Sequence, residues 1–329
     1  HGKFRRQRQM CIRDRIPMNE DITFKKGQFG YIEYKSSNPY EFHQIIKDYE
    51  KSPSQDAKGW LLFPEKFSGK LSCMVCVHHS GGWGGAQYQM MIQLLEAGYA
   101  VFQVDSFDAR GVTSTAEDQL SVTYAMLMAD AYEALKFLSR HPDIDNKKIG
   151  ICGWSLGGAA SLYSAWLPLA EKLAPNGERF ALHLNYYPLA IYWPDEMRWS
   201  DSPILNLLGG KDDYTPYSLA QKITEGIKDV GGDCSYILYE EGLHGFDSVM
   251  PKTFWPDSIV PNTEKFARID KEGDITYETD DGEILPGNTM EDRIVLFEKI
   301  AALGAWTGGN WDIRRKAKKD AFDFIAKIL

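Results

Sequence analysis

Cysteine is scarce in this chain, which has five cysteines among its 329 residues, an odd number that does not suit a disulfide framework. Cys73 and Cys76 form a C-x-x-C pair within an apolar run, but residues three apart on a strand point to opposite faces of the sheet. The pair is therefore badly placed to bind one metal ion, and no second Cys or His pair completes a zinc-binding set. We expect free, buried thiols, no metal and no cofactor, and a reducing, cytoplasmic compartment.

The chain also lacks the long apolar run and the positive charge that membrane and nucleic-acid partners favour. No apolar stretch approaches the roughly 20 residues that a membrane-spanning helix needs, and the net charge is -9 at pH 7. Positive charge gathers only in residues 1–15, HGKFRRQRQMCIRDR, which have no apolar centre and so do not form a signal peptide. Part of this segment resembles a translated sequencing adapter, and we predict a non-native or disordered extension.

Composition and patterning predict an α/β fold. Hydrophobic residues make up 43% and charged residues 25% of the chain, as in ordinary globular domains. Runs typical of strands alternate with helical patterns, which predicts a mainly parallel central sheet with helices on both faces. Strands are expected at 30–33, 59–63, 72–79, 99–104, 148–152, 181–187, 204–208 and 235–239, and helices at 122–138, 218–230, 291–303 and 312–329.

Two segments depart from this alternation. Residues 51–58 are polar and predict a disordered stretch between the first two strands. Residues 247–309 are rich in Pro, Asp, Glu and Gly, and the TYETDDGEIL segment within them predicts a hairpin around Asp281-Gly282. We interpret 247–309 as an excursion packed on one domain that spans residues 16–329.

The pentapeptide Gly153-Trp154-Ser155-Leu156-Gly157 stands between an apolar strand-like run and a run of small residues typical of a helix. A G-x-S-x-G sequence in that setting is typical of a nucleophile elbow, in which a sharp turn presents the serine and glycines permit the close approach of strand and helix. Ser155 is therefore the candidate nucleophile. A glycine-rich turn with an ordinary surface serine is the alternative.

A serine hydroxyl needs a base to take its proton and a carboxylate to orient that base. The loop after the 204–208 strand reads GGKDDYTP, and the loop after the 235–239 strand contains His244. His244 is the candidate base. Asp212 and Asp213 compete as the acid, and we favour Asp212 because it is nearer the end of its strand, with Asp213 capping the following turn.

An acyl-transfer site also needs N–H donors for the oxyanion. We expect one from Leu156, which follows the nucleophile at a helix N-terminus. The other should come from the small-residue loop that follows the 72–79 strand, with the Ser80 N–H as first choice and the Gly81 N–H as second.

These motifs, in this order, resemble those of the dienelactone hydrolase family within the α/β-hydrolases. The resemblance rests on the HHSGG loop, the DSFDARG segment at 105–111, GWSLGG, GGKDDYTP and HGF. It implies an α/β-hydrolase fold and a triad of Ser155, Asp212 and His244. Family members that open dienelactones carry cysteine as nucleophile, so the serine here points toward general ester hydrolysis.

The resemblance also places an arginine near the substrate, which makes Arg110 a candidate for binding a substrate carboxylate; a structural ion pair is the equal alternative. Trp154 neighbours the nucleophile and is a candidate for the substrate pocket. We expect a cofactor-free esterase acting on a small-molecule ester, with lactones or thioesters as close alternatives. A peptidase of the prolyl-oligopeptidase type and a non-hydrolytic binding protein of the same fold remain open, as does the oligomeric state.

Overall fold

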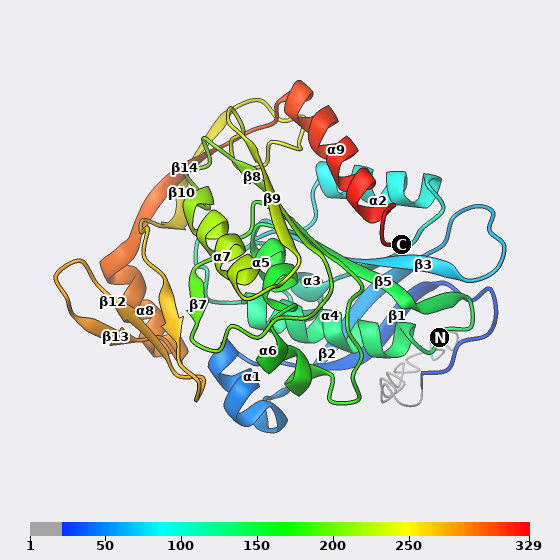
Figure 1. Ribbon diagram of the computed structural model, residues 1–329, viewed down its shortest axis with the longest axis horizontal. Coiled ribbons are helices and arrows are strands. Elements are labelled where there is room, and N and C mark those ends of the chain that lie inside the picture. The colour runs from blue at the N-terminus through cyan, green and yellow to red at the C-terminus, as the bar shows by residue number, and fades with distance from the viewer. Residues whose placement is uncertain (1–21) are drawn as a thin grey trace, which may run out of the picture.

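An eight-stranded sheet forms the centre of the molecule in the computed structural model, which describes residues 22–329 (Figure 1). The predicted extension at 1–15 lies outside the described residues. The strand order is β1-β2-β4-β3-β5-β6-β8-β9, with antiparallel pairing from β1 through β2 to β4 and parallel pairing beyond. The mainly parallel sheet is therefore confirmed. The strands are β1 Gly30–Ser37, β2 Ser54–Leu62, β3 Leu71–Val77, β4 Ala100–Val104, β5 Ile144–Trp154, β6 His183–Tyr186, β8 Ile204–Gly209 and β9 Cys234–Tyr239.

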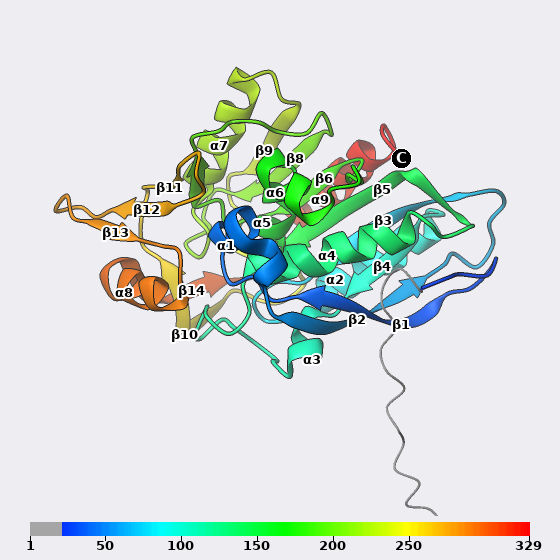
Figure 2. The same ribbon diagram turned by 90° about the horizontal axis from the view of Figure 1, so that it is seen from below.

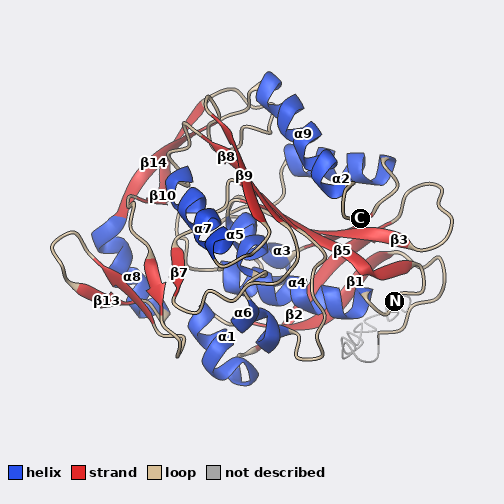
Figure 3. Cartoon of the chain, in the orientation of Figure 1, coloured by secondary structure: helices blue, strands red, loops and turns tan. Residues whose placement is uncertain are grey.

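Helices cover both faces of this sheet, as predicted (Figure 3). One face carries α1 (Phe42–Asp48), α4 (Tyr124–Leu138), α5 (Leu156–Tyr163), α6 (Leu167–Leu173) and α7 (Tyr217–Asp229), and the other carries α2 (Gly85–Glu96) and α9 (Trp311–Ile325). Short helical segments lie at α3 (Ser106–Arg110) and at Tyr49–Lys51. Side chains of β3 alternate between the two cores, so Cys73 packs on the α4 side and Cys76 on the α2 and α9 side. Both thiols are free and buried, as the spacing predicted.

The polar stretch at 51–58 is ordered, which corrects the prediction of disorder. Most of it belongs to β2, which pairs with β1 on one side and with β4 on the other. Ala57, Gly59 and Leu61 face the core, while Lys58 and Trp60 between them are more exposed. A strand needs apolar residues at only every second position, so a polar sequence pairs here without loss of backbone hydrogen bonds.

Residues 247–309 form a layer of strands around one helix, beside the end of the sheet (Figure 2). The hairpin is confirmed, since β12 (Ile275–Glu278) and β13 (Ile284–Pro286) pair antiparallel. The helix α8 (Met290–Ile300) ends before residue 303 because the next residues form β14 (Ala301–Thr307), which pairs with β10 (Thr253–Pro261). The remaining strand β11 (Ala267–Ile269) pairs with β7 (Tyr192–Pro194). Apolar residues of this layer join the core on the α4 side.

Whether 16–329 is one folding unit stays a prediction. Among the described residues, no helix combines the length and hydrophobicity required to span a bilayer.

Candidate active site

Ser155 lies in a strained turn between β5 and α5, with φ 53° and ψ -112°. The turn depends on its glycines. A Cβ at Gly153 would come within 1.9 Å of the Gly157 carbonyl oxygen, and a Cβ at Gly157 would come within 2.4 Å of the backbone oxygens of Val77 and His78. Strand, turn and helix can therefore approach this closely only without those side chains.

The structure brings Ser155, His244 and Asp212 together in one hydrogen-bonded chain. His244 Nε2 lies 3.0 Å from Ser155 Oγ, and its Nδ1 lies 2.9 Å from Asp212 Oδ2. All three residues follow parallel strands at the same edge of the sheet, and all are buried. With the Nδ1 proton donated to Asp212, Nε2 is left free to accept the proton of the serine hydroxyl.

The two neighbouring acids, Asp212 and Asp213, make different contacts. Asp212 Oδ1 accepts from the backbone N–H of Tyr214 (2.9 Å) and Thr215 (2.8 Å). Asp213 Oδ1 instead accepts from the backbone N–H of Trp306 in β14 (3.0 Å). The predicted turn cap at Asp213 is therefore wrong, because Asp212 caps its own turn as well as contacting His244.

Sequence reasoning missed two residues that hold the hydrogen-bonded Ser155–His244–Asp212 chain in place. Thr215 Oγ1 lies 3.0 Å from Asp212 Oδ2 and 3.2 Å from His244 Nδ1. The ring of Tyr214 stacks on the His244 imidazole, with centroids 4.6 Å apart and planes 21° from parallel. Both residues follow Asp212 closely in GGKDDYTP, and this position near the candidate acid could have identified them.

A buried carboxylate, Asp247, is linked to the imidazole through Tyr187 and was also missed. It accepts hydrogen bonds from the Tyr187 hydroxyl (2.8 Å) and from Trp154 Nε1 (3.0 Å). Burial raises the pKa of the Asp247 carboxyl, and these two donors oppose that shift. The Tyr187 ring in turn contacts the His244 ring at a centroid distance of 4.6 Å.

The two expected oxyanion donors border the same cavity as Ser155. Within residues 22–329, the backbone N–H groups of Ser80 and Leu156 donate a hydrogen bond to no acceptor. The Gly81 N–H, in contrast, donates to His79 Nδ1 at 2.9 Å. Burial lowers the pKa of His79 to about 3, so this imidazole is neutral and can accept. The contacts thus favour Ser80 over Gly81.

Arg110 does not face the cavity, which corrects its expected place beside the substrate. Its guanidinium donates to Asp130 Oδ2 (2.6 Å) and Oδ1 (3.2 Å), to the Ser106 carbonyl (3.0 Å) and to Asn38 Oδ1 (2.8 Å). Asp130 is fully buried on α4. A buried carboxylate requires a cation partner, and Arg110 supplies it.

Trp154 also lies away from the cavity. It is wholly buried in the core beside α2 and α9 and stacks on Tyr186 with ring centroids 5.3 Å apart. The strand places Ser155 in the turn but directs the preceding side chain to the opposite core. The predicted substrate contact of Trp154 is therefore wrong.

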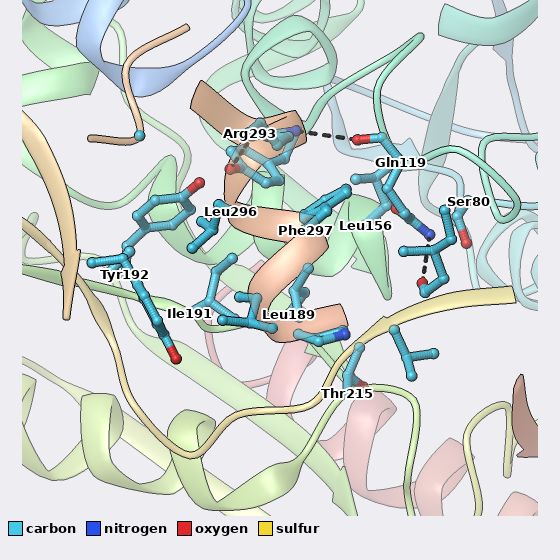
Figure 4. A pocket seen from close by; sticks show the side chains of 18 of the residues that line it. Ser80, Gln119, Leu156, Leu189, Ile191, Tyr192, Thr215, Arg293, Leu296 and Phe297 are labelled. Carbon is cyan, nitrogen blue, oxygen red and sulfur yellow. Dashed lines mark hydrogen bonds between the residues drawn. The ribbon is translucent and has the colours of Figure 1, made fainter. Parts of the chain in front are cut away.

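The cavity beside Ser155 extends under the 247–309 layer, so that α8 and residues of β10 cover it (Figure 4). Its walls are largely apolar, and include Leu189, Ile191, Leu296 and Phe297. The volume open to water-sized spheres is about 60 Å³, above the roughly 10–15 Å³ that a single water requires.

Across residues 22–329, no three His, Cys, Asp or Glu side chains gather in a way that could hold a metal ion.

Comparison with known proteins places this arrangement in a family. The model of the dienelactone hydrolase family matches residues 58–265, a segment that holds Ser155, Asp212 and His244. The chain belongs to the dienelactone hydrolase family. The matched segment holds the candidate triad and the central sheet from β3 to β9, whereas β1, α1 and α8 lie outside it.

Two curated relatives are similar over shorter stretches. An "Uncharacterized peptidase YuxL" of Bacillus subtilis is 21% identical over 219 residues, which are 56% of this chain and 33% of that protein. A "Putative carboxymethylenebutenolidase" of Methylorubrum extorquens is 25% identical over 164 residues, 47% of this chain and 56% of that protein. The chain thus matches between one third and just over half of the length of these relatives.

Solved structures show more distant likenesses. A putative dienelactone hydrolase from Klebsiella pneumoniae is 17% identical with a TM-score of 0.48, covering 66% of this chain and 88% of that one. A thermophilic esterase from Thermogutta terrifontis is 18% identical with a TM-score of 0.45, covering 58% of this chain and 81% of that one.

Proposed function

We propose that this protein is a cofactor-free serine hydrolase that cleaves carboxylic esters of small molecules through a triad of Ser155, His244 and Asp212. The observation that carries the proposal is the hydrogen-bonded chain from Ser155 Oγ to His244 and on to Asp212, at the edge of a cavity. Membership of a hydrolase family supports the reaction class.

The geometry supports the following steps. His244 Nε2 takes the Ser155 proton while Oγ attacks the ester carbonyl carbon, and the N–H groups of Ser80 and Leu156 stabilise the oxyanion. The imidazolium then protonates the departing alcohol oxygen, leaving an acyl-enzyme. His244 next takes a proton from water, whose oxygen attacks the acyl carbonyl and releases the acid. Asp212 holds the imidazole and balances its transient charge.

Lactones and thioesters need the same groups, so they remain candidate substrates. A peptidase activity is a second candidate, because one relative is named a peptidase. The largely apolar walls suit an acyl or alcohol group better than a polar peptide backbone, which favours esters over peptides. A binding protein without turnover is the further alternative.

The test is labelling with a fluorophosphonate, together with hydrolysis of p-nitrophenyl acetate. We expect the label on Ser155, and we expect Ser155→Ala to lower kcat on the order of 10⁶-fold with little change in melting temperature. Ser161→Ala is the matched control, because it removes a hydroxyl without a hydrogen-bond partner from the same buried helix. Turnover that survives in Ser155→Ala would refute the nucleophile, and ligand binding without turnover would favour the binding protein.

A further inference from the structure

A buried ion pair closes part of the cavity beside Ser155. Arg293 lines it (Figure 4). Glu41 lines it too, and within the described part of the chain these two are its charged lining residues. Their side chains are 1% and 8% exposed. Since the rest of the wall is mostly apolar, this pair gives the cavity its strongest hydrogen-bonding groups.

The pair lies within a set of hydroxyl groups. Arg293 Nη2 donates to the Glu41 carboxylate and to the Tyr124 hydroxyl oxygen, and Nη1 donates to the Gln119 carbonyl at 3.3 Å. The Tyr124 hydroxyl itself donates to Glu41 Oε2 at 2.9 Å, and the Tyr192 hydroxyl interacts with both charged groups. A guanidinium has five N–H donors, so these three hydrogen bonds of Nη1 and Nη2 leave donor capacity for a ligand.

Both members are held in place by their own elements. Glu41 is the N-cap of α1: its side chain accepts from the Phe42 N–H, and Gln44 completes a capping box. Arg293 is carried by α8, which covers the cavity. Glu41 and Arg293 both lie outside the segment that the family model matches.

A buried ion pair is a weak source of stability, because two charges lose their hydration and apolar residues could fill the same space. In a cavity that reaches the candidate nucleophile, the pair gains a second use as a recognition site. The charges cancel, and Glu41 is tied to its helix cap. A ligand carboxylate would therefore meet a guanidinium that is already neutralised, whereas a hydroxyl could both accept from Arg293 and donate to Glu41.

We propose that the Glu41–Arg293 pair recognises a neutral hydroxyl on the substrate, so that the preferred substrates are short esters hydroxylated on the acyl or the alcohol part. This inference rests on the proposed ester hydrolysis and names its substrate class.

The experiment compares esters in which a hydroxyl replaces a methyl group of the same size. Ethyl β-hydroxybutyrate is paired with ethyl isovalerate for the acyl part, and hydroxyethyl acetate with propyl acetate for the alcohol part. Monoethyl succinate tests a carboxylate. Each kcat/KM is measured in a pH-stat and divided by the rate constant for hydroxide-catalysed hydrolysis, which removes intrinsic reactivity. We expect the hydroxyl member of at least one pair to be preferred by at least about tenfold.

The double variant Glu41→Gln/Arg293→Met tests the residues, since glutamine can still cap α1 and no unpaired charge is left. The preference should fall to about onefold. The control Glu171→Gln/Arg198→Met makes the same changes in an exposed ion pair and should keep the preference. If the first variant does not fold, the ratios of the unmodified protein decide the inference alone.

Equal kcat/KM within both pairs, with turnover of p-nitrophenyl acetate intact, would overturn hydroxyl recognition and leave ester hydrolysis standing. A preference for monoethyl succinate would overturn it in favour of anion binding. A hydroxyl preference that is retained in the double variant would show that the pair only connects α8 to α1 and does not bind the substrate. Absence of both labelling and turnover would remove the proposed function, and this inference with it.

Discussion

Replacing Arg110 with methionine should destabilise the protein without changing how it binds esters. The side chain is 5% exposed, and two of its four hydrogen bonds go to the fully buried Asp130. Arg110→Met removes the cation but leaves the carboxylate in the core. Breaking a buried pair in this way costs about 3–5 kcal/mol, which lowers the ratio of folded to unfolded protein more than about 100-fold.

Urea unfolding followed by tryptophan fluorescence measures this loss, and kcat and KM are taken under conditions where both proteins are folded. The control is Arg198→Met, which breaks a bidentate pair with Glu171 whose side chains are 47% and 46% exposed. That pair should contribute no more than about 1 kcal/mol. A raised KM for Arg110→Met with unchanged stability would refute the structural role and restore Arg110 as a substrate ligand.

Three further predictions concern the turn, the acid and the pH dependence. Gly157→Ala should abolish turnover and lower the yield of folded protein, since the added Cβ would lie 2.4 Å from two backbone oxygens; wild-type activity would show that the turn relaxes. Asp212→Asn should lower kcat by about 10⁴-fold, whereas Asp213→Asn should change kcat little; the reverse result would reassign the acid. Burial lowers the pKa of His183 to about 4 from its ordinary 6.5. As the pH falls from 6.5 to 4, the unfolded chain therefore binds a proton at His183 while the folded protein does not. Its share of the free energy of unfolding should drop by about 3 kcal/mol over that interval, and His183→Gln should flatten the slope seen in urea titrations at several pH values; an unchanged slope would contradict this burial effect.

Local sequence was enough to place the elements that depend on local chemistry. The buried strands, the long helix α4 and the hairpin around Asp281-Gly282 follow from periodicity and turn residues, which act over a few positions. The Ser155 turn follows from glycines that no other residue can replace at those contacts. The order of the motifs then placed His244 and Asp212 at the same sheet edge, because parallel strands end on one side.

Strand pairing between segments far apart in the sequence could not be predicted from these local patterns. The strands β10 and β14 form a two-stranded sheet, and more than 30 residues separate them in the sequence. Residues 301–303 therefore looked like the continuation of α8. Polar β2 likewise depends on partners supplied by β1 and β4.

The amino-acid sequence by itself determined the family, the mainly parallel sheet and the residues that can form a triad, because each of these rests on short patterns with a local physical cause. The tertiary structure decided which side chains meet. It paired Arg110 with Asp130 and placed the Trp154 side chain in the core on the α2 and α9 side of the sheet. It also brought together Glu41 and Arg293, which are 252 positions apart in the sequence. Such contacts arise from the packing of distant elements, and burial and charge partners exist only once those elements are packed.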